Sequence, residues 1–308
     1  MKKKKVLIAA STFCELSKIP LKLLKKNNFD IIKNNLQRRL KANEIIKMGK
    51  NVDGIIAGLE TYNYKVLKSL IKIKCISRVG VGVDNINQDY AKKNKIKILN
   101  TPKVVVEPVA QLTIGMLLNL SRKINIMNNS MKKKLWKKIY GNDITHKKIG
   151  IIGVGQIGKR VAEILLAFGA QLLLNDIKKN TKWAKKQNFK YVSLKHLIKN
   201  SDIILIHASN KMKREILRLS DIKMMKDGVI LINCSRGKLI NEKALEYGLK
   251  SKKISGLGLD VFNKEPYSGN LSKYNNVLLT PHIATFTKET RMQMELEATN
   301  NLIKSFKK

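Results

Sequence analysis

Apolar residues in the first hundred positions fall into short runs that are separated by stretches with helical spacing. A short, continuous apolar run predicts a strand that is buried on both faces. Apolar positions at three- and four-residue intervals predict amphipathic helices. We expect strands at residues 6–10, 29–32, 54–57, 74–77 and 95–99, and helices at 21–26, 42–48, 65–70 and 88–94. This alternation predicts a parallel sheet with helices on both faces.

The alternation stops at Thr101-Pro102 and returns after a different kind of segment. Residues 104–127 read as one long helix, with Pro108 near its start, where proline is tolerated. The basic segment 132–138 predicts a solvated connection, and we expect its Trp136 to pack against a domain face. Further strands are expected in a run ending at Gly153 and at 171–175, 191–192, 202–207, 228–233, 256–259 and 277–280, and a final helix at 287–306.

These patterns predict two α/β domains, because 308 residues are too many for one ordinary core. We place the first domain at residues 1–102 plus 286–308 and the second at residues 103–285. If the long helix and the last helix both span the junction, the C-terminus completes the N-terminal domain.

The formal net charge of +40 indicates either a polyanion partner or a lysine-rich solvated surface. Only nine of the 62 basic residues are arginine, the type best suited to bidentate phosphate recognition. The lysines also spread along the whole chain, without interleaved aromatic residues. We therefore expect salt-sensitive adhesion to polyanions and no specific nucleic-acid binding.

The sequence favours a cytoplasmic protein without a membrane span. No apolar run reaches the ~18 residues that a spanning helix needs. The apolar run at residues 6–10 is too short for a signal peptide. Cys14, Cys75 and Cys234 are scattered, without the spacing of a disulfide framework or a metal site. We expect no bound metal.

A glycine-rich turn stands between a predicted strand and a predicted helix, the context that a dinucleotide fingerprint requires. In Gly153-Val154-Gly155-Gln156-Ile157-Gly158, the first glycine allows the turn and the second lets backbone approach a pyrophosphate. The third lets the helix pack against the strand, and the helix start then faces the phosphates. The alternative is a glycine-rich connection in another kind of α/β protein.

Asp176 follows the next predicted strand, eighteen positions after Gly158. A carboxylate there can accept both ribose hydroxyls and would repel the 2′-phosphate of NADP. This indicates NAD as the cofactor. Two alternatives remain open: Asp176 is a solvated strand-end carboxylate, or the cations Lys178 and Lys179 tolerate a phosphate.

The segment Arg78-Val79-Gly80-Val81-Gly82 follows a predicted strand of the first domain. Its successive N–H groups could form a nest for a carboxylate or phosphate, with Arg78 adjacent. The alternative is a strand-to-helix turn with a helix cap at Asp84 or Asn85.

Of four histidines, His282 is the candidate acid/base because it follows the predicted strand at 277–280. A nicotinamide enzyme that oxidises an alcohol needs a base for the hydroxyl proton, and imidazole titrates near neutral pH. His146 falls in a basic loop and His196 on a helix face, while His207 ends a buried strand and could line the cofactor crevice.

Three other polar side chains follow apolar strands in the second half. Arg236, beside Gly237, could hold a carboxylate in a bidentate fork or could be a surface arginine. Asp260 could face the nicotinamide, and Glu265 could hydrogen-bond an imidazole. Both carboxylates could instead cap a helix or turn.

Together these motifs resemble the D-isomer-specific 2-hydroxyacid dehydrogenases over nearly the whole chain. The resemblance is carried by segments 78–85 and 153–158, Asp176, Arg236-Gly237, 260–266 and 280–284. It implies a Rossmann-type NAD-binding domain inserted into a flavodoxin-like parallel-sheet substrate domain. It also implies homodimers built through the cofactor domains.

The same resemblance implies roles for individual residues. Arg236 would bind and polarise the substrate, His282 would be the acid/base, and Glu265 would pair with His282. The expected NAD contacts are Gly153, Gly155, Gln156, Ile157, Gly158, Asp176, His207, Cys234 and Asp260. The expected contacts to the substrate are Arg78, Val79, Gly80 and Val81.

Within that family the chain is most similar to the phosphoglycerate dehydrogenase branch, and we expect no regulatory domain after Lys308. Our first expectation is therefore oxidation of 3-phosphoglycerate to 3-phosphohydroxypyruvate. However, the loop at 57–61 carries Glu60 where that branch commonly has a phosphate-binding arginine. Reduction of glyoxylate, hydroxypyruvate or another 2-oxo acid stays open, as does a non-catalytic NAD-sensing role.

Overall fold

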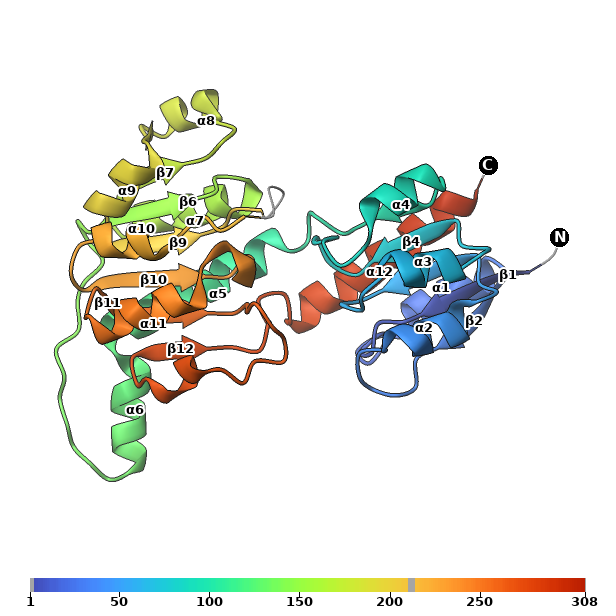
Figure 1. The fold of residues 1–308 in the computed structure, drawn as a ribbon, viewed down its shortest axis with the longest axis horizontal. Helices are drawn as coiled ribbons and strands as arrows, with labels where there is room; N and C mark the ends of the chain where they lie inside the picture. The colour runs from blue at the N-terminus through green and yellow to red at the C-terminus, as the bar shows by residue number, and fades with distance from the viewer. Residues whose placement is uncertain (1–2, 210–213, 308) are drawn as a thin grey trace. The chain divides into compact units, whose positions relative to one another are not determined.

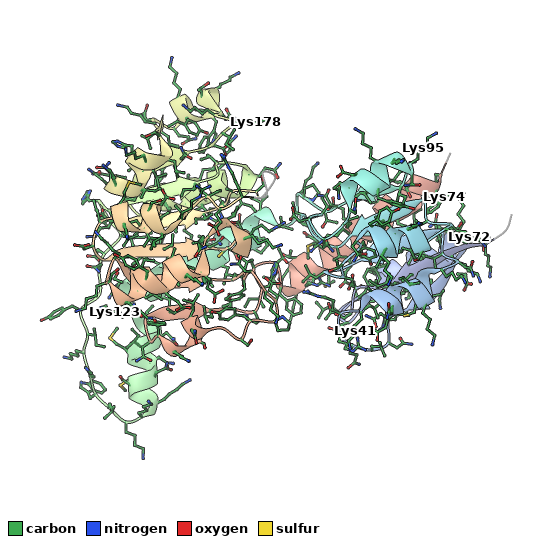
Figure 2. All side chains as sticks on the ribbon, viewed as in Figure 1. Lys41, Lys72, Lys74, Lys95, Lys123 and Lys178 are labelled. Atoms are coloured by element: carbon green, nitrogen blue, oxygen red, sulfur yellow. The ribbon has the colours of Figure 1, made fainter. Side chains whose placement is uncertain are left out.

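A computed structural model describes residues 3–209 and 214–307 (Figure 1). The chain forms two compact units. Unit 1 comprises Met1–Val105 and Thr285–Lys308, and unit 2 comprises Val106–Ala284. Lysine side chains such as Lys41, Lys72 and Lys178 project outward from the ribbon (Figure 2), as a solvated basic surface requires.

Unit 1 contains one five-stranded parallel sheet in the order β2-β1-β3-β4-β5, the flavodoxin-like order. Apolar side chains of β1, β3 and β4, such as Leu7, Ile55 and Ile76, belong to one buried cluster. Its elements are β1 (Lys4–Ile8), α1 (Ile19–Lys26), β2 (Phe29–Lys33), α2 (Ala42–Gly49), β3 (Gly54–Ala57), α3 (Tyr64–Ser69), β4 (Cys75–Arg78), α4 (Gln88–Lys93), β5 (Lys97–Leu99) and α12 (Lys288–Phe306).

The C-terminal helix α12 completes unit 1. It packs against β3, β4 and β5, and the Ser77 hydroxyl on β4 donates to the Ala298 carbonyl at 2.7 Å. The first and last segments of the chain therefore belong to one core.

Unit 2 contains a seven-stranded parallel sheet in the order β12-β11-β10-β9-β6-β7-β8, the Rossmann order with one added strand. Its elements are α5 (Val106–Arg122), α6 (Ile124–Lys132), β6 (Lys148–Ile152), α7 (Gln156–Ala167), β7 (Gln171–Asn175), α8 (Thr181–Lys186), β8 (Lys190–Tyr191), α9 (Leu194–Asn200), β9 (Ile203–Ile206), α10 (Leu219–Met224), β10 (Val229–Asn233), α11 (Glu242–Lys250), β11 (Ile254–Leu259), β12 (Val277–Leu279) and the short 3₁₀ turns η1 (Gly237–Leu239) and η2 (Asn270–Lys273).

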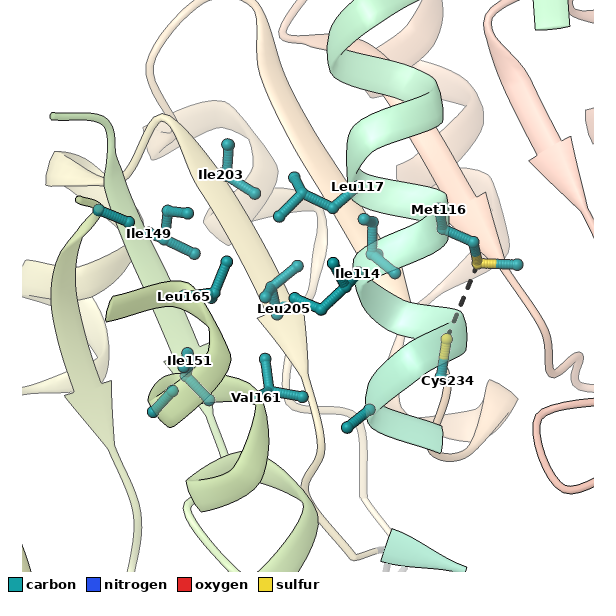
Figure 3. Packing of buried hydrophobic residues seen from close by; sticks show 14 of the residues in the cluster. Ile114, Met116, Leu117, Ile149, Ile151, Val161, Leu165, Ile203, Leu205 and Cys234 are labelled. Atoms are coloured by element: carbon teal, nitrogen blue, oxygen red, sulfur yellow. Dashed lines mark hydrogen bonds between the residues drawn. The ribbon is translucent and has the colours of Figure 1, made fainter. Parts of the chain in front are cut away.

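Strand β9 shows why the central strands of unit 2 are apolar throughout. Ile203 and Leu205 pack into the cluster that includes α5 and α7, where Figure 3 shows them. Ile204 and Ile206 pack into the cluster on the opposite face. Both faces of a parallel sheet are covered by helices, so neither set of alternate side chains is polar. The predicted fold class is confirmed.

The prediction of one helix over residues 104–127 is wrong. Helix α5 ends at Arg122, and Lys123 adopts the left-handed conformation with φ of 54° before α6 begins. The Asn125 N–H donates to the Asn119 side chain at 3.2 Å, which fits this break. Trp136 was also expected to be packed, but it is 80% exposed.

Within the two described ranges, no helix is both long and apolar enough to cross a bilayer.

Candidate active site

The strand order of unit 2 reverses between β6 and β9, and open α/β sheets bind ligands at the carboxyl ends of strands beside such a reversal. The glycine turn at residues 153–158 lies there, between β6 and α7. Gly153 has a φ of +93°, and a Cβ on it would lie 2.4 Å from the Ala208 backbone nitrogen. A Cβ on Gly158 would lie 2.1 Å from the Gly153 carbonyl oxygen. Both glycines are therefore required by close packing.

Gly155 differs because a Cβ there would meet nothing within 4 Å. Among the described residues, none lies beside this position and none caps the start of α7 with its side chain. A helix start without a side-chain cap offers its first N–H groups and the positive end of its dipole to an anion. The turn fits the pyrophosphate of a dinucleotide.

Asp176 at the end of β7 is bonded to this turn. Its Oδ2 accepts the Val154 N–H at 2.6 Å, and its Oδ1 accepts the Lys178 N–H at 2.8 Å. Each carboxylate oxygen can accept a second hydrogen bond, so the residue still fits a ribose diol. The donors and acceptors present suit a dinucleotide whose ribose carries no phosphate.

His207 follows β9 on the other side of the strand reversal. Its ring nitrogens are buried and have no hydrogen-bond partner among the described residues. Burial lowers the pKa of His207 to about 4. The ring is therefore neutral near pH 7 and keeps one donor and one acceptor for a ligand.

His207 should make folding stability depend on pH. Between the unfolded pKa near 6.5 and the folded pKa of about 4, the unfolded chain binds the extra proton. Stability should therefore fall as pH drops from 7 to 5, by about 2 kcal/mol from this residue. Urea unfolding of His207→Asn should lack that part of the dependence, whereas His196→Asn on an exposed helix face should retain it. An unchanged slope in His207→Asn contradicts the burial argument.

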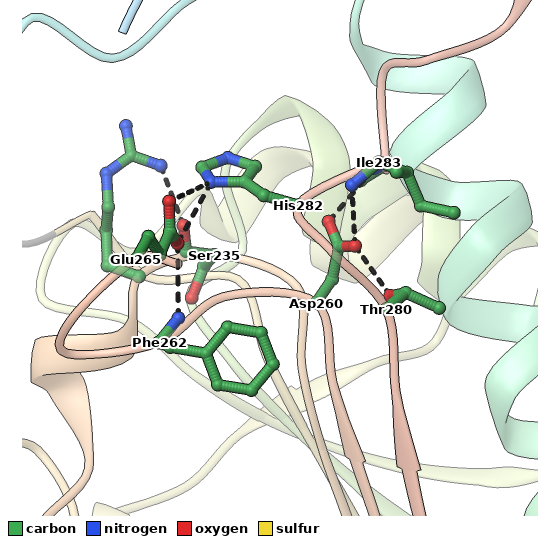
Figure 4. Close-up of polar contacts among 9 residues, drawn as sticks. Ser235, Asp260, Phe262, Glu265, Thr280, His282 and Ile283 are labelled. Atoms are coloured by element: carbon green, nitrogen blue, oxygen red, sulfur yellow. Dashed lines mark hydrogen bonds and ion pairs between the residues drawn. The ribbon is translucent and has the colours of Figure 1, made fainter. Parts of the chain in front are cut away.

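Three segments follow the neighbouring strands β10, β11 and β12 and carry the remaining candidates (Figure 4). His282 stands just beyond β12 in the left-handed conformation, with φ of 57°. Its Nδ1 lies 3.0 Å from Glu265 Oε2 and 3.1 Å from Glu265 Oε1. The two side chains are about one-third and one-fifth exposed. Because Nδ1 faces the carboxylate, Nε2 is the nitrogen left to exchange a proton with a ligand.

Asp260 determines the shape of the His282 turn. Its Oδ1 accepts the Thr280 hydroxyl at 2.6 Å and the Ile283 N–H at 2.8 Å, while Oδ2 accepts the Ala284 N–H at 2.9 Å. The residue is fully buried, and burial raises the pKa of its carboxyl group. Thr280 takes part in this turn but was not singled out in the sequence, where it only adjoins Pro281.

Arg236 is held by its own loop after β10. Its Nη1 donates to the Ser235 carbonyl at 2.7 Å, and the Asn233 amide donates to the Arg236 carbonyl at 2.9 Å. A Cβ on Gly237 would lie 2.1 Å from the Phe262 carbonyl carbon. Only glycine lets the Arg236 loop pack so closely against the segment that carries Glu265.

The Cys234 side chain does not face this polar group. Its Sγ lies 3.8 Å from Met116 Sδ inside the apolar cluster, as Figure 3 shows. Burial raises the pKa of this thiol to about 12. Only the backbone atoms of Cys234 can therefore contact a cofactor.

In unit 1, the predicted nest follows β4. The Val79 N–H donates to Ala57 at 2.8 Å and the Gly80 N–H to Thr101 Oγ1 at 2.9 Å. The N–H groups of Val81 and Gly82 form no hydrogen bond with another described residue. Arg78 is buried and donates to the Val79 carbonyl, and its guanidinium lies over Gly80, which has a φ of +134°.

The alternative considered for this segment, a helix cap at Asp84 or Asn85, is wrong, because Asn87 caps α4. The Asn87 side chain accepts the Tyr90 N–H at 2.9 Å. Asn85 instead donates to the Gly58 and Glu60 carbonyls, which ties this segment to the loop after β3.

The chain is similar to known proteins over most of its length. The model of the NAD-binding domain of D-isomer-specific 2-hydroxyacid dehydrogenases matches residues 114–284. A hydroxypyruvate reductase of Thermotoga maritima is 33% identical over 293 residues, 92% of each chain. The solved D-lactate dehydrogenase of Aquifex aeolicus, complexed with NAD and lactic acid, has a TM-score of 0.85 at 28% identity, covering 98% of this chain and 95% of that one. A glyoxylate reductase from Paecilomyes thermophila has a TM-score of 0.88 at 28% identity, with the same coverage.

Proposed function

The chain belongs to the D-isomer-specific 2-hydroxyacid dehydrogenase family, and from that premise we propose that it reduces small, unphosphorylated 2-oxo acids, above all hydroxypyruvate and glyoxylate. It is an NAD-dependent oxidoreductase. The observation that carries the proposal is the contact of His282 Nδ1 with Glu265 beside the Arg236 loop. We assign residues 1–102 and 286–308 to the substrate domain and residues 103–285 to the cofactor domain.

The residues of unit 2 divide the reduction between them. NADH supplies the hydride when it is bound. Arg236 holds the substrate carboxylate in a two-point fork, which orients the C2 carbonyl. His282 donates a proton from Nε2 to the C2 oxygen, and Glu265 stabilises the charged imidazole and fixes its orientation through Nδ1. In the reverse direction His282 takes the hydroxyl proton.

The cofactor contacts follow from the geometry around β6. The turn at 153–158, including the N–H groups of Gln156 and Ile157, receives the pyrophosphate. Asp176 accepts the ribose hydroxyls, and its charge opposes a 2′-phosphate. His207 and Asp260 lie at the ends of β9 and β11, where a nicotinamide amide needs hydrogen-bond partners. In unit 1, the N–H groups of Val81 and Gly82, which bond no other described residue, are the part of the nest that can bind a carboxylate.

The substrate class rests on Glu60 in the loop after β3. This loop adjoins the point where the strand order of unit 1 reverses, between β1 and β3. Glu60 is 2% exposed and accepts the Gly58 N–H at 2.7 Å, and burial raises its pKa. The loop itself carries a carboxyl group and no cation, although burial, the largest effect on the pKa of Glu60, is opposed by the nearby Arg78 and Arg39. A phosphate dianion would therefore have to be bound beside a carboxyl group. We therefore rank 3-phosphoglycerate second.

Substrate profiling checks this ranking. With NADH, the purified protein should reduce hydroxypyruvate and glyoxylate with a kcat/KM about 100-fold above that for 3-phosphohydroxypyruvate. This factor corresponds to a loss of about two to three kcal/mol of transition-state stabilisation when the phosphate group is repelled by Glu60. Glu60→Gln should reduce the difference in kcat/KM between the unphosphorylated and the phosphorylated acids. Glu15→Gln, at an exposed carboxylate of the same unit, should leave that difference unchanged. Preference for the phosphorylated acid supports the phosphoglycerate assignment instead. NADH binding without turnover of any acid supports a sensing protein.

We also propose that the chain is a cytoplasmic homodimer. Helix α6 has no buried residue within one chain, and the segment after it exposes Leu135, Trp136 and Tyr140. A second copy could cover these apolar side chains. A molar mass in solution that corresponds to one chain only would contradict the dimer.

The cysteines support the cytoplasmic location. All three are free and buried, as in proteins of reducing compartments.

A further inference from the structure

Residues 262–267, which we call the strap, carry Glu265 and are closed by two aromatic rings. Phe262 and Tyr267 stand at its ends, and their rings stack with centroids 4.3 Å apart and planes 20° apart. The Phe262 N–H donates to Glu265 Oε1 at 3.2 Å. Phe262 therefore links the two features: its ring stacks on Tyr267, and its N–H bonds the Glu265 carboxylate.

The Tyr267 hydroxyl anchors the strap to a helix. It donates to Glu242 Oε1 at 2.7 Å and accepts the Leu271 N–H at 3.2 Å. Glu242 lies in the first turn of α11, which packs against β11. A Cβ on Gly269 would lie 2.4 Å from the Tyr267 oxygen, so a larger residue there would displace this hydroxyl. Both hydrogen-bonding capacities of the hydroxyl are thus used.

We propose that Tyr267 and Glu242 are positioning residues that hold the strap so that Glu265 faces His282. The proposal rests on the function inferred above, in which Glu265 orients the imidazole. Neither residue is assigned a contact with substrate or cofactor. Their effect passes through the ring stack to Phe262, and from its N–H to the Glu265 carboxylate.

The other side of the strap shows why this anchor matters. Gly237 presses against the Phe262 backbone, so the strap already has one fixed neighbour in the Arg236 loop. The Tyr267–Glu242 bond supplies the second, on α11. Without it, the Glu242 carboxylate loses the Tyr267 hydroxyl, and the strap loses its hydrogen bond to α11. Small displacements of a positioning group reduce turnover without weakening substrate binding.

A double-mutant cycle tests the proposal. Tyr267→Phe removes the hydroxyl and keeps the ring, and Glu242→Ala removes its partner. Each should lower kcat for hydroxypyruvate about fivefold and change KM less than twofold. In a protein that already carries Glu265→Gln, the same two substitutions should lower kcat less than twofold, because the carboxylate that they position is already replaced. Glu242→Gln, which keeps an acceptor oxygen, should restore most of the rate, and Tyr274→Phe serves as the matched control.

A second readout needs no turnover. In protein labelled with ¹⁵N-histidine, the Nδ1 proton of His282 should give a protected signal, identified by its loss in His282→Asn. This signal should weaken in Tyr267→Phe and Glu242→Ala and persist in Tyr274→Phe. Equal rate losses in both backgrounds, or a signal unchanged in both variants, would overturn the proposal. A wild-type protein that turns over no 2-oxo acid but shows the predicted signals would instead contradict the proposed function alone.

Discussion

Replacing His282 with asparagine is expected to lower kcat for hydroxypyruvate reduction by about 1,000-fold, within the range that general acid catalysis contributes. Asparagine can still donate a hydrogen bond toward Glu265, so the strap should keep its place. It cannot deliver a proton near neutral pH. KM and the affinity for NADH should change little, because the loss falls on the transition state.

Steady-state kinetics with a fluorescence titration of NADH separates these effects. His196→Asn on α9 provides the matched control and should retain full turnover. If His282→Asn retained wild-type kcat, the proton role of His282 would be wrong, whatever the contacts with Glu265.

Arg236→Lys is expected to lower kcat/KM for hydroxypyruvate by about 100-fold, although the positive charge is kept. Lysine is a point charge and lacks the planar fork that matches a carboxylate at two points. Loss of one such charge-assisted contact costs about 2–3 kcal/mol, which corresponds to that factor. Arg236→Ala should lose more.

The measurement is a comparison of carboxylate and amide substrates. The wild-type protein should prefer hydroxypyruvate strongly over its uncharged amide, and Arg236→Ala should remove most of that preference. Arg122→Lys, at an exposed arginine of α5, should leave both rates unchanged. An Arg236→Ala variant that keeps the full preference would place the carboxylate-binding group elsewhere.

Most strands could be predicted because a parallel strand buried on both faces leaves a continuous apolar run. Leu205 and Ile206 on β9 pack into clusters on opposite faces of the sheet, so both positions are apolar and the run at 202–207 is continuous. Predicting the break at Lys123 was not possible in the same way. Left-handed backbone favours glycine or asparagine, and a lysine gives no sign of it.

The candidate site shows a similar division. Arg236, Asp260 and His282 each follow an apolar run, and adjacent parallel strands place their carboxyl ends along one edge of a sheet. The sequence therefore indicated their grouping, while their catalytic roles stay proposals. The bond between Tyr267 and Glu242 could not be predicted, because it depends on how the strap folds back onto α11.

The Cys234 position shows a different case. Ile230, Ile232 and Cys234 lie in the same buried cluster, so the side chain of Cys234 continues the alternation of β10 one position beyond the strand. Its thiol packs against Met116 in the core. The alternation along residues 229–233 could therefore have indicated that this side chain faces the core and not a cofactor.

Deuterium transfer from NADH tests the central claim most directly. NADH deuterated at C4 on the transferred face, incubated with hydroxypyruvate and the protein, should give D-glycerate with one deuterium at C2, and NAD without it. Mass spectrometry measures the deuterium in the product, and chiral separation determines its configuration at C2. Product without deuterium at C2, the L-isomer, or no product from any 2-oxo acid would contradict the account.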